Sequence, residues 1–224
     1  MKRKQFVVIG LGRFGVSVTK TLIGNGHEVL AIDIDEHKVQ EISTDASYAV
    51  QIDATDEVAL EQLGIHKYSH AIVGIGEDLQ ASILITLLLK EMEVEKITAK
   101  AKDEHHGKVL TKIGADQVIF PERDMGRRLG NLIGSNHLVD YLELSDDYHV
   151  EEILVQKGMS HWKIEDLEVN RKYGCTIVAI KDRKQNIDIS PKQDRVLREG
   201  EILILIGKPK SIQKMQKDYD KTVK

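Results

Sequence analysis

The protein has 224 residues, of which 41% are hydrophobic and 30% charged, and its formal net charge is −4. This ordinary globular balance lacks the surplus of lysine and arginine that binds a phosphate backbone, which argues against nucleic acid as a partner. The length favours a nucleotide-binding-sized domain followed by a smaller one. Cys175 is the only cysteine, so no intramolecular disulfide can form and a reducing, cytoplasmic compartment is expected.

Membrane insertion is not expected from the hydropathy pattern. The longest apolar run lies near Ile83 to Leu89, far short of the roughly 20 residues that a spanning helix needs. The basic N-terminus is followed by an apolar run, but Arg13 interrupts that run, so we expect a first strand and not a leader peptide. Any association with a membrane is therefore expected to pass through a partner.

Short runs rich in valine and isoleucine alternate with amphipathic segments from the N-terminus to about residue 120. This alternation is typical of βαβ units around a parallel sheet. The pattern predicts strands at 5–11, 28–33, 48–53, 70–75, 96–101 and 117–120. Two successive βαβαβ halves make a Rossmann-like, doubly wound parallel sheet of the α/β class.

The pattern changes after Pro121. Residues 122–133 predict a helix whose apolar stripe contains Leu129, Leu132 and Ile133. Short alternating runs separated by turn signals follow it and predict a different, strand-rich unit. We therefore expect a nucleotide-binding domain at 1–121, a crossover helix and dimerisation segment at 122–138, and a small α+β subdomain at 139–224. A subdomain of this size makes a small core, so pairing with a second copy is expected.

Glycines after the first predicted strand indicate a phosphate-binding turn. Gly10, Gly12 and Gly15 form G-x-G-x-x-G between a strand and a helix, and would hold phosphates at the helix N-terminus. Asp33 ends the second strand 18 positions after Gly15, where an acidic side chain binds ribose hydroxyls and disfavours a 2′-phosphate. The combination predicts an adenine nucleotide and leaves ATP, ADP and NAD open.

Asp53 and Ala54 end the third predicted strand, at the same edge of the sheet. Ligands of such folds gather at the carboxyl ends of the strands, so both residues are candidates for the adenine side of the site. Plainer interpretations stay open for the acidic residues. Asp33 could be a solvated carboxylate or a helix N-cap, and Asp53 could be the N-cap of the segment that follows it.

Signs of an enzyme are few. No tyrosine is followed four residues later by lysine, a common arrangement in short dehydrogenases. His105 and His106 would point about 100° apart on a helix, so they are expected to be solvated and not to share a metal ion. Ser160 and Lys163 form S-x-x-K without its companion motifs, and Cys175 is expected to be a buried structural residue. We therefore predict no catalytic activity, with a small NAD-dependent oxidoreductase or an NAD-sensing regulator as the alternative.

Longer motifs resemble one known family. They are VIGLGRFG (8–15), AIDID (31–35), GEDLQASILITLLLK (76–90), KAKDEHHGKVLTKIGAD (100–116), FPERDMGRRL (120–129) and RKYGCTIVAIK (171–181). By these motifs the whole chain resembles the RCK proteins, built from TrkA-N and TrkA-C domains, that regulate Ktr-type bacterial potassium uptake systems. The resemblance implies a cytosolic subunit that binds ATP or ADP, forms dimers that assemble into an octameric ring, and gates a membrane-embedded potassium transporter.

The resemblance also implies roles for single residues. Arg13 would reach across the dimer to the terminal phosphate on the neighbouring subunit, and its alternative is a solvated surface arginine. Glu122 would bind Mg²⁺ or Na⁺ between facing nucleotides, and its alternative is a first-turn glutamate that favours the helix dipole. Further nucleotide contacts are implied for Phe14, Asp35, Gly76 and Lys100.

In many relatives the C-terminal subdomain binds cyclic di-AMP in a pocket at a dimer interface, which inactivates transport. The resemblance places that pocket here at Ile164, Asn170, Thr176, Ile177 and Pro191. In the family the pocket carries an arginine and an asparagine, whereas Asn170 and Thr176 stand at those positions in this chain. The neighbouring Arg171 is expected on the other side of a strand.

Overall fold

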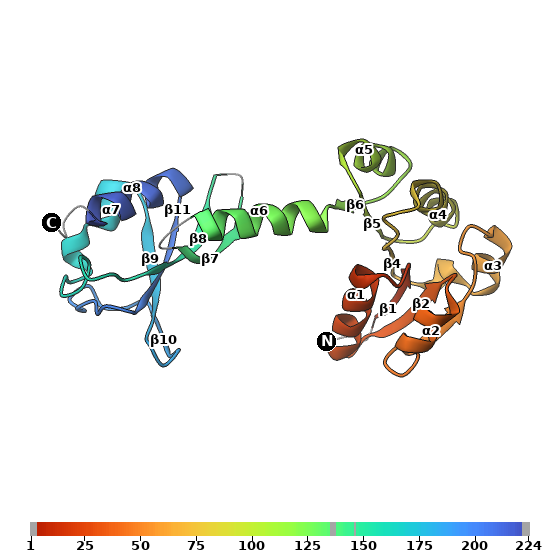
Figure 1. The fold of residues 1–224 in the computed structure, drawn as a ribbon, viewed down its shortest axis with the longest axis horizontal. Helices are drawn as coiled ribbons and strands as arrows, with labels where there is room; N and C mark the ends of the chain where they lie inside the picture. Colours follow the sequence, from red (N-terminus) through yellow and green to blue (C-terminus); the bar gives the residue numbers. More distant parts are fainter. Residues whose placement is uncertain (1–3, 135–137, 146, 221–224) are drawn as a thin grey trace. The chain divides into compact units, whose positions relative to one another are not determined.

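The computed structural model describes residues 4–134, 138–145 and 147–220 (Figure 1). The chain divides into two compact units, Met1–Met125 and Gly126–Lys224. Each unit is described by itself.

The first unit contains a six-stranded parallel sheet with the strand order β3-β2-β1-β4-β5-β6. Its strands are β1 (Gln5–Ile9), β2 (Glu28–Asp33), β3 (Tyr48–Gln51), β4 (His70–Val73), β5 (Ile97–Lys100) and β6 (Gln117–Ile119). All six predicted strands are present, and the reversal of strand order between β1 and β4 confirms the doubly wound sheet. Several strands end one or two residues before their predicted limits, because the chain turns off the sheet edge there.

Helices connect the strands of this sheet (Figure 1). They are α1 (Arg13–Gly24), α2 (Glu36–Ile42), α3 (Glu57–Gln62), α4 (Leu79–Glu91) and α5 (Glu104–Lys112), with a 3₁₀ turn at Ile65–Lys67. Four of them start after an aspartate whose side chain accepts a backbone N–H of the first turn: Asp35, Asp56, Asp78 and Asp103. Short polar side chains are favoured at that position because they satisfy donors that have no partner within the helix.

The central strands are buried on both faces, as a parallel sheet covered by helices requires. Along β1, Val7 and Ile9 pack into one apolar cluster, while Phe6 and Val8 pack into another. Successive side chains of a strand point to opposite faces, so a continuous apolar run supplies both clusters. This rigid centre places the loops at the carboxyl ends of the strands.

The second unit contains a five-stranded antiparallel sheet with the order β10-β9-β11-β8-β7. Its strands are β7 (Leu138–Glu143), β8 (His149–Leu154), β9 (Thr176–Lys181), β10 (Ile187–Ile189) and β11 (Ile202–Gly207). A 3₁₀ turn (Glu165–Leu167) and two helices, α7 (Val169–Tyr173) and α8 (Pro209–Asp220), complete the α+β arrangement. The apolar side chains of α8, such as Ile212 and Met215, join Leu203 and Leu205 of β11 in one core.

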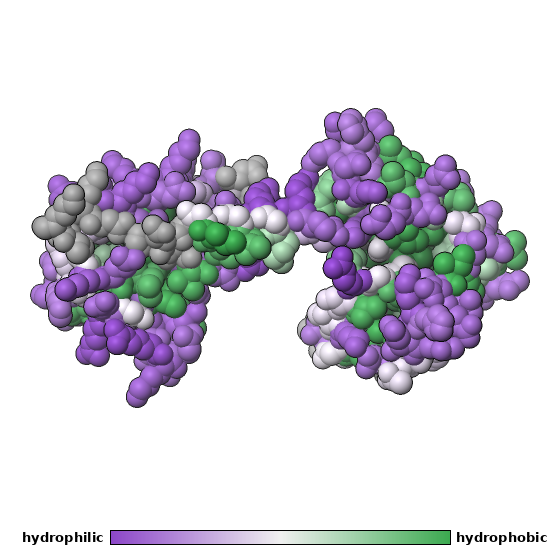
Figure 2. All heavy atoms as spheres, viewed as in Figure 1, coloured by the Kyte–Doolittle hydropathy of each residue, from purple (hydrophilic) through white to green (hydrophobic). Residues whose placement is uncertain are grey.

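Helix α6 (Pro121–Gly134) spans the division between the two units and covers the predicted helix at 122–133. None of its residues is buried, and Leu129 and Ile133 are 53% and 74% exposed. Figure 2 shows apolar surface over this helix. Of the predicted apolar stripe, Leu129 and Ile133 are therefore exposed and Leu132 is partly buried among the residues that the structure describes.

Across the described part of the chain, each helix is too short or too polar to cross a membrane.

Candidate functional site

A cleft of ≈ 420 Å³ opens at the carboxyl ends of the first four strands. It lies where the strand order reverses, the place where doubly wound sheets bind their ligands. Six of the residues predicted to contact a nucleotide line it: Gly10, Gly12, Asp33, Asp53, Ala54 and Gly76. The fold therefore brings together residues that follow four different strands.

The glycine turn after β1 meets distinct steric demands at its three glycines. Gly10 has φ of +94°, which glycine adopts at little cost, and a Cβ there would lie 2.8 Å from Ile75 Cγ1. A Cβ on Gly15 would overlap the carbonyl oxygen of Gly10, so glycine is needed for α1 to pack against the turn. A Cβ on Gly12 would meet no atom within 4 Å. The side of the turn at Gly12 is thus open to a ligand.

The N-terminus of α1 differs from those of α2 to α5. Gly12 precedes the helix and no side chain caps it, whereas an aspartate caps each of the other four. The first N–H groups of a helix have no partner within it, and together with the helix dipole they attract anions. The residues present therefore fit a phosphate group at Gly12. Arg13 is exposed and Phe14 packs against the core beside it, and neither lines the cleft.

Asp33 is buried at the end of β2, and the backbone of two loops holds its carboxylate. Oδ2 accepts the N–H of Leu11 at 2.6 Å, and Oδ1 accepts the N–H of Asp35 at 2.9 Å. Both plainer interpretations of Asp33 are wrong, because it is only 7% exposed and Asp35 is the N-cap of α2. Carboxylate oxygens have further lone pairs, so Asp33 can still accept a hydrogen bond from a ribose hydroxyl.

Sequence patterns did not point to Lys38, which also lines the cleft. Its ammonium lies 3.5 Å from Asp33 Oδ2 and 3.9 Å from Asp35 Oδ2. The only hint in the sequence is the i,i+3 spacing from Asp35, which places the two side chains on one helix face. Asp35 itself accepts the N–H of His37 at 2.9 Å and does not line the cleft, so its nucleotide contact stays a prediction.

Asp53 follows β3, which is two strands away from β1 in the sheet, and it lines the cleft. Its carboxylate accepts the hydroxyl of Thr55 at 2.7 Å and the N–H of Thr55 at 2.9 Å, and these bonds lower the pKa of Asp53. Asp56 caps α3, so the interpretation of Asp53 as an N-cap is wrong. Ala54 is buried and lines the cleft, as predicted for a residue beside the nucleotide.

Lys100 and Glu122 form an ion pair next to the cleft, with Nζ and Oε1 2.7 Å apart. A Cβ on Gly76 would lie 3.1 Å from the Lys100 ammonium, so this pair adjoins the residue that lines the cleft. The hydrogen bond from Lys100 lowers the pKa of Glu122, and the positive charge of Arg13 acts in the same direction. The charges of Lys100 and Arg13 therefore both stabilise the ionised form of Glu122.

Glu122 lies in the first turn of α6, the position that its plainer interpretation requires. Its side chain is 70% exposed and already bound to Lys100. In the described part of the chain, no group of three or more His, Cys, Asp or Glu side chains could hold a metal ion. A cation at Glu122 would therefore need oxygen ligands from outside the chain, such as nucleotide phosphates.

The two adjacent histidines of α5 differ in their surroundings. His106 is buried, its Nδ1 accepts the N–H of Lys102 at 3.2 Å, and burial lowers its pKa. The expectation that both are solvated is therefore wrong for His106, because adjacent side chains on a helix point about 100° apart and one of them faces the core. Cys175 is fully buried as expected, and burial raises the pKa of its thiol.

A separate hollow of ≈ 350 Å³ lies in the second unit. Four of the five residues predicted for cyclic di-AMP line it: Ile164, Asn170, Thr176 and Ile177. Asn170 Nδ2 donates to Thr176 Oγ1 at 3.4 Å. The two side chains at which this chain is expected to differ from the family therefore contact each other. Pro191 is buried but does not line the hollow.

Charges around this hollow are mixed. Arg171 lies on the short helix α7 and not on a strand, which corrects the sequence expectation. Its Nη1 is 3.1 Å from Glu168 Oε1, and Glu168 also pairs with Lys172. Glu165 and Glu168 both line the hollow, so an anionic ligand would meet two carboxylates as well as Arg171.

Comparison with known proteins relates both units to described families. Residues 6–121 match the TrkA-N domain and residues 150–219 match the TrkA-C domain. The chain is 48% identical over 215 residues to Ktr system potassium uptake protein C of Bacillus subtilis (strain 168), covering 96% of this chain and 97% of that protein. It is 44% identical over 218 residues to Ktr system potassium uptake protein A of the same organism, covering 97% and 98%.

Solved structures share the fold. The GsuK RCK domain has a TM-score of 0.66 at 18% identity and covers 95% of this chain. The GsuK channel bound to NAD has a TM-score of 0.55 at 27% identity and covers 98% of it, and GsuK bound to ADP has 0.51 at 20% and covers 58%. The match spans 46%, 39% and 34% of those chains, less than half of each.

Proposed function

The chain belongs to the family of TrkA-N and TrkA-C proteins that includes the Ktr system potassium uptake proteins, and on that premise we propose that it is a nucleotide-binding regulatory subunit of a potassium transporter. The ligand is ATP or ADP, and the site is the cleft at the carboxyl ends of β1 to β4. The output is gating of a membrane-embedded potassium transporter and no chemical conversion of the nucleotide.

One observation carries the nucleotide part of the proposal. The α1 N-terminus is the one left without a side-chain cap among α1 to α5, and the glycine beside it faces open space. Phosphates bound there would occupy the unpaired N–H groups, while Asp33 would accept the ribose hydroxyls. An adenine ring would then lie toward Asp53 and Ala54, which line the far part of the same cleft.

Arg13 supplies the discrimination between ATP and ADP in this proposal. Its side chain is exposed, starts beside the phosphate turn and makes no hydrogen bond or ion pair within the described residues. A guanidinium forms strong charge-assisted hydrogen bonds with phosphate oxygens, and ATP has one more phosphate than ADP to offer. We propose that Arg13 reaches the terminal phosphate of a nucleotide bound by a neighbouring subunit.

A cation at Glu122 is the second element of the proposed interface. Mg²⁺ or Na⁺ would be held by the Glu122 carboxylate together with nucleotide phosphate oxygens, ligands that suit hard cations. Binding of the cation would compete with Lys100 for Glu122, so Lys100 would be free to bind phosphate. Lys100 would thus bind Glu122 when the site holds no cation, and it would bind a phosphate group when the cation is present.

The exposed apolar residues of α6 support the proposed assembly of several chains. Leu129 and Ile133 lie four residues apart on one helix face and are exposed. Pairing of two chains through this stripe would form the dimer, and further pairing of the nucleotide-binding units would form the octameric ring. Closure of the ring on ATP would then act on the membrane subunit.

Titration calorimetry with ATP, ADP, NAD and NADH, with and without Mg²⁺, tests the nucleotide proposal. We expect binding of ATP and ADP to exceed that of both dinucleotides, and light scattering should give a particle of several chains. Preference for NADH by a monomer or dimer would instead support the alternative, an NAD-sensing regulator or small oxidoreductase. The solved channel bound to NAD keeps that alternative worth testing.

The sensing role of Arg13 needs a transport assay. Arg13→Ala is expected to bind ADP normally and to lose the difference in potassium flux between ATP and ADP in proteoliposomes with the membrane subunit. Lys20→Ala is a matched control, because Lys20 is an exposed cation of the same helix and pairs with Asp45, away from the glycine turn. ATP activation that survives in Arg13→Ala would refute the sensing role.

A second proposal concerns the hollow around Asn170 and Thr176, which we propose as a cyclic di-AMP site that inhibits transport. It is supported by the convergence of four predicted residues on one hollow. Calorimetry with cyclic di-AMP tests it directly. Binding should weaken on Thr176→Trp, which fills the hollow, and absence of binding by the unaltered chain would remove the proposal.

A further inference from the structure

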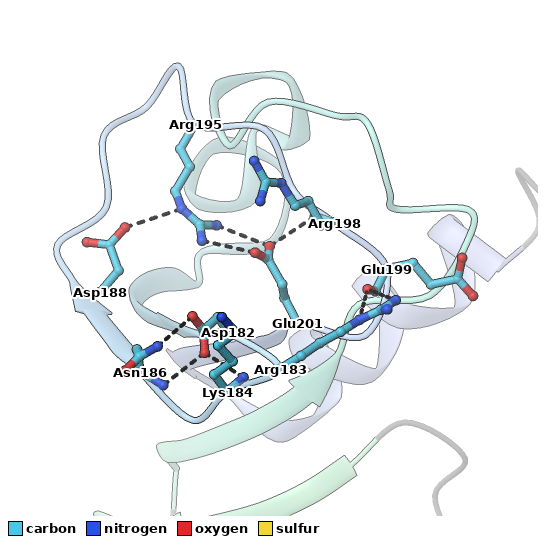
Figure 3. Close-up of polar contacts among 9 residues, drawn as sticks. All are labelled: Asp182, Arg183, Lys184, Asn186, Asp188, Arg195, Arg198, Glu199 and Glu201. Carbon is cyan, nitrogen blue, oxygen red and sulfur yellow. Dashed lines mark hydrogen bonds and ion pairs between the residues drawn. The ribbon is translucent and has the colours of Figure 1, made fainter.

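The second unit carries another hollow, of ≈ 680 Å³, between the β9–β10 turn and the loop that leads into β11. It is lined by three cations, Arg183, Lys184 and Arg198, and by His161 and Ser160. Three acidic residues also line it, Asp182, Glu199 and Glu201. Figure 3 shows these charged side chains on the two loops.

Two of the three acidic side chains of the hollow accept hydrogen bonds from neighbouring residues, and the third points away from the cations. Asp182 accepts the N–H groups of Lys184 and Asn186 and the side-chain amide of Asn186, and these bonds lower its pKa. Glu201 is 4% exposed and binds Arg195 at 3.1 and 3.2 Å and the N–H of Arg198 at 2.9 Å. In Figure 3 the carboxylate of Glu199 points away from the other side chains.

The cations, in contrast, keep free donors. The Lys184 ammonium and the Arg198 guanidinium make no hydrogen bond or ion pair within 4–134, 138–145 and 147–220. Arg183 donates through Nε and Nη2 to the carbonyl oxygen of Glu199, which fixes the guanidinium over Gly200. One edge of that guanidinium is therefore held by the loop, and Nη1 stays available.

Buried support keeps this arrangement in place. Arg195 links Glu201, the residue before β11, to Asp188 of β10, with Arg195 Nε 3.2 Å from Asp188 Oδ2. A buried carboxylate with several charge-assisted hydrogen bonds holds its loop firmly, since breaking one partner leaves an uncompensated charge. The loops that present Arg198 and Arg183 are thus anchored before any ligand arrives.

We propose that this hollow binds a small phosphate-bearing anion through Lys184, Arg198 and the free edge of Arg183. Its volume falls within the usual range for small-molecule sites. Guanidinium and ammonium groups are the usual partners of phosphate oxygens, and of the three carboxylates Glu201 is paired with Arg195 while Asp182 is held by Asn186 and the N–H of Lys184. The site shares no lining residue with the nucleotide cleft or with the hollow at Asn170.

Pyrophosphate is the probe for a first test on the full chain. Hydrogen-exchange mass spectrometry should show saturable protection of residues 182–186 and 195–201, and calorimetry gives the affinity. Lys184→Gln with Arg198→Gln should weaken this binding at least about tenfold, because two charge-assisted contacts are lost. Both side chains are exposed and without described contacts, so the double variant should fold, which circular dichroism checks.

A charge-matched control separates the site from general electrostatics. Lys214→Gln with Lys217→Gln removes the same charge from the exposed side of α8, outside the hollow. Equal weakening in both double variants, or no protection of 182–201, would overturn the proposal.

AMP as a second probe tells a nucleotide from a free phosphate compound, because only a nucleotide site gains affinity from the adenosine. Protection that appears only at the glycine turn would also refute the site.

Discussion

The N–H of Leu11 donates to Asp33 Oδ2 at 2.6 Å and so ties the glycine turn after β1 to the end of β2. The same carboxylate accepts the N–H of Asp35 through Oδ1. One buried side chain therefore sets both the phosphate end and the ribose end of the cleft. A change at Asp33 is expected to affect folding and binding together.

Asp33→Asn tests this linkage. The amide has one acceptor oxygen for two backbone donors, so its NH₂ group would face either Leu11 or Asp35. We expect a loss of roughly 1–3 kcal/mol in the free energy of unfolding, the usual cost of an unsatisfied buried donor. Thermal denaturation followed by circular dichroism measures it. Unaltered stability with lost nucleotide binding would mean that Asp33 acts only on the ligand.

Gly15→Ala and Gly12→Ala form a pair with opposite expected effects. A methyl group on Gly15 would overlap the Gly10 carbonyl oxygen, so α1 must move and stability should fall by roughly 3 kcal/mol. A methyl group on Gly12 meets open space, so stability should change by less than about 1 kcal/mol. Nucleotide affinity should nevertheless fall in Gly12→Ala, because the methyl group enters the space of the phosphates. Equal destabilisation by both substitutions would contradict these steric assignments.

Lys38 offers a prediction about charge in the cleft. It is the only Lys or Arg among the described residues that line the cleft, and it offsets Asp33 and Asp35. Lys38→Gln should weaken ATP roughly three- to tenfold and AMP less, since the repulsion of Asp33 acts on every phosphate charge. Lys20→Gln removes an exposed, paired lysine elsewhere in the unit and should leave both affinities unchanged. An equal loss for AMP and ATP would point to contact with the adenosine instead.

Glu151 makes the stability of the second unit depend on pH. It is 6% exposed in the core face of β8, and burial raises its pKa to about 7. The unfolded chain ionises near pH 4.5 and the folded chain only near pH 7, so stability falls as pH rises through that window. The loss reaches about 3 kcal/mol above pH 7.

Trp162 is the single tryptophan and packs against the core of the second unit, so its fluorescence reports that unit in urea titrations. Comparison of unfolding at pH 5 and pH 8 gives the pH effect, to which other groups also contribute. Glu151→Gln cannot ionise and should remove about 2.5 kcal/mol of that difference, because part of the loss has already occurred at pH 5. A pH dependence identical in the variant and the unaltered chain would show that Glu151 is not buried as described.

Much of the first unit could be predicted from the sequence, because its signals are local. The apolar runs at 5–11 and 28–33 have the β-branched character of buried strands, and G-x-G-x-x-G between strand and helix has few other uses. Aspartates before α2 to α5 satisfy helix donors within three residues of themselves. These interactions join residues that are close together in the sequence, so the residue types that make them can be recognised from the sequence alone.

Only the tertiary structure decided how distant side chains pair. Lys100 meets Glu122, and Arg183 meets the loop at Glu199, across separations that no periodicity describes. His106 turned out to be buried although its neighbourhood in the sequence is polar, because its helix face packs on the sheet. Coulomb interactions and hydrogen bonds depend on distances of a few ångströms, and those distances exist only once the sheet order has brought the loops together.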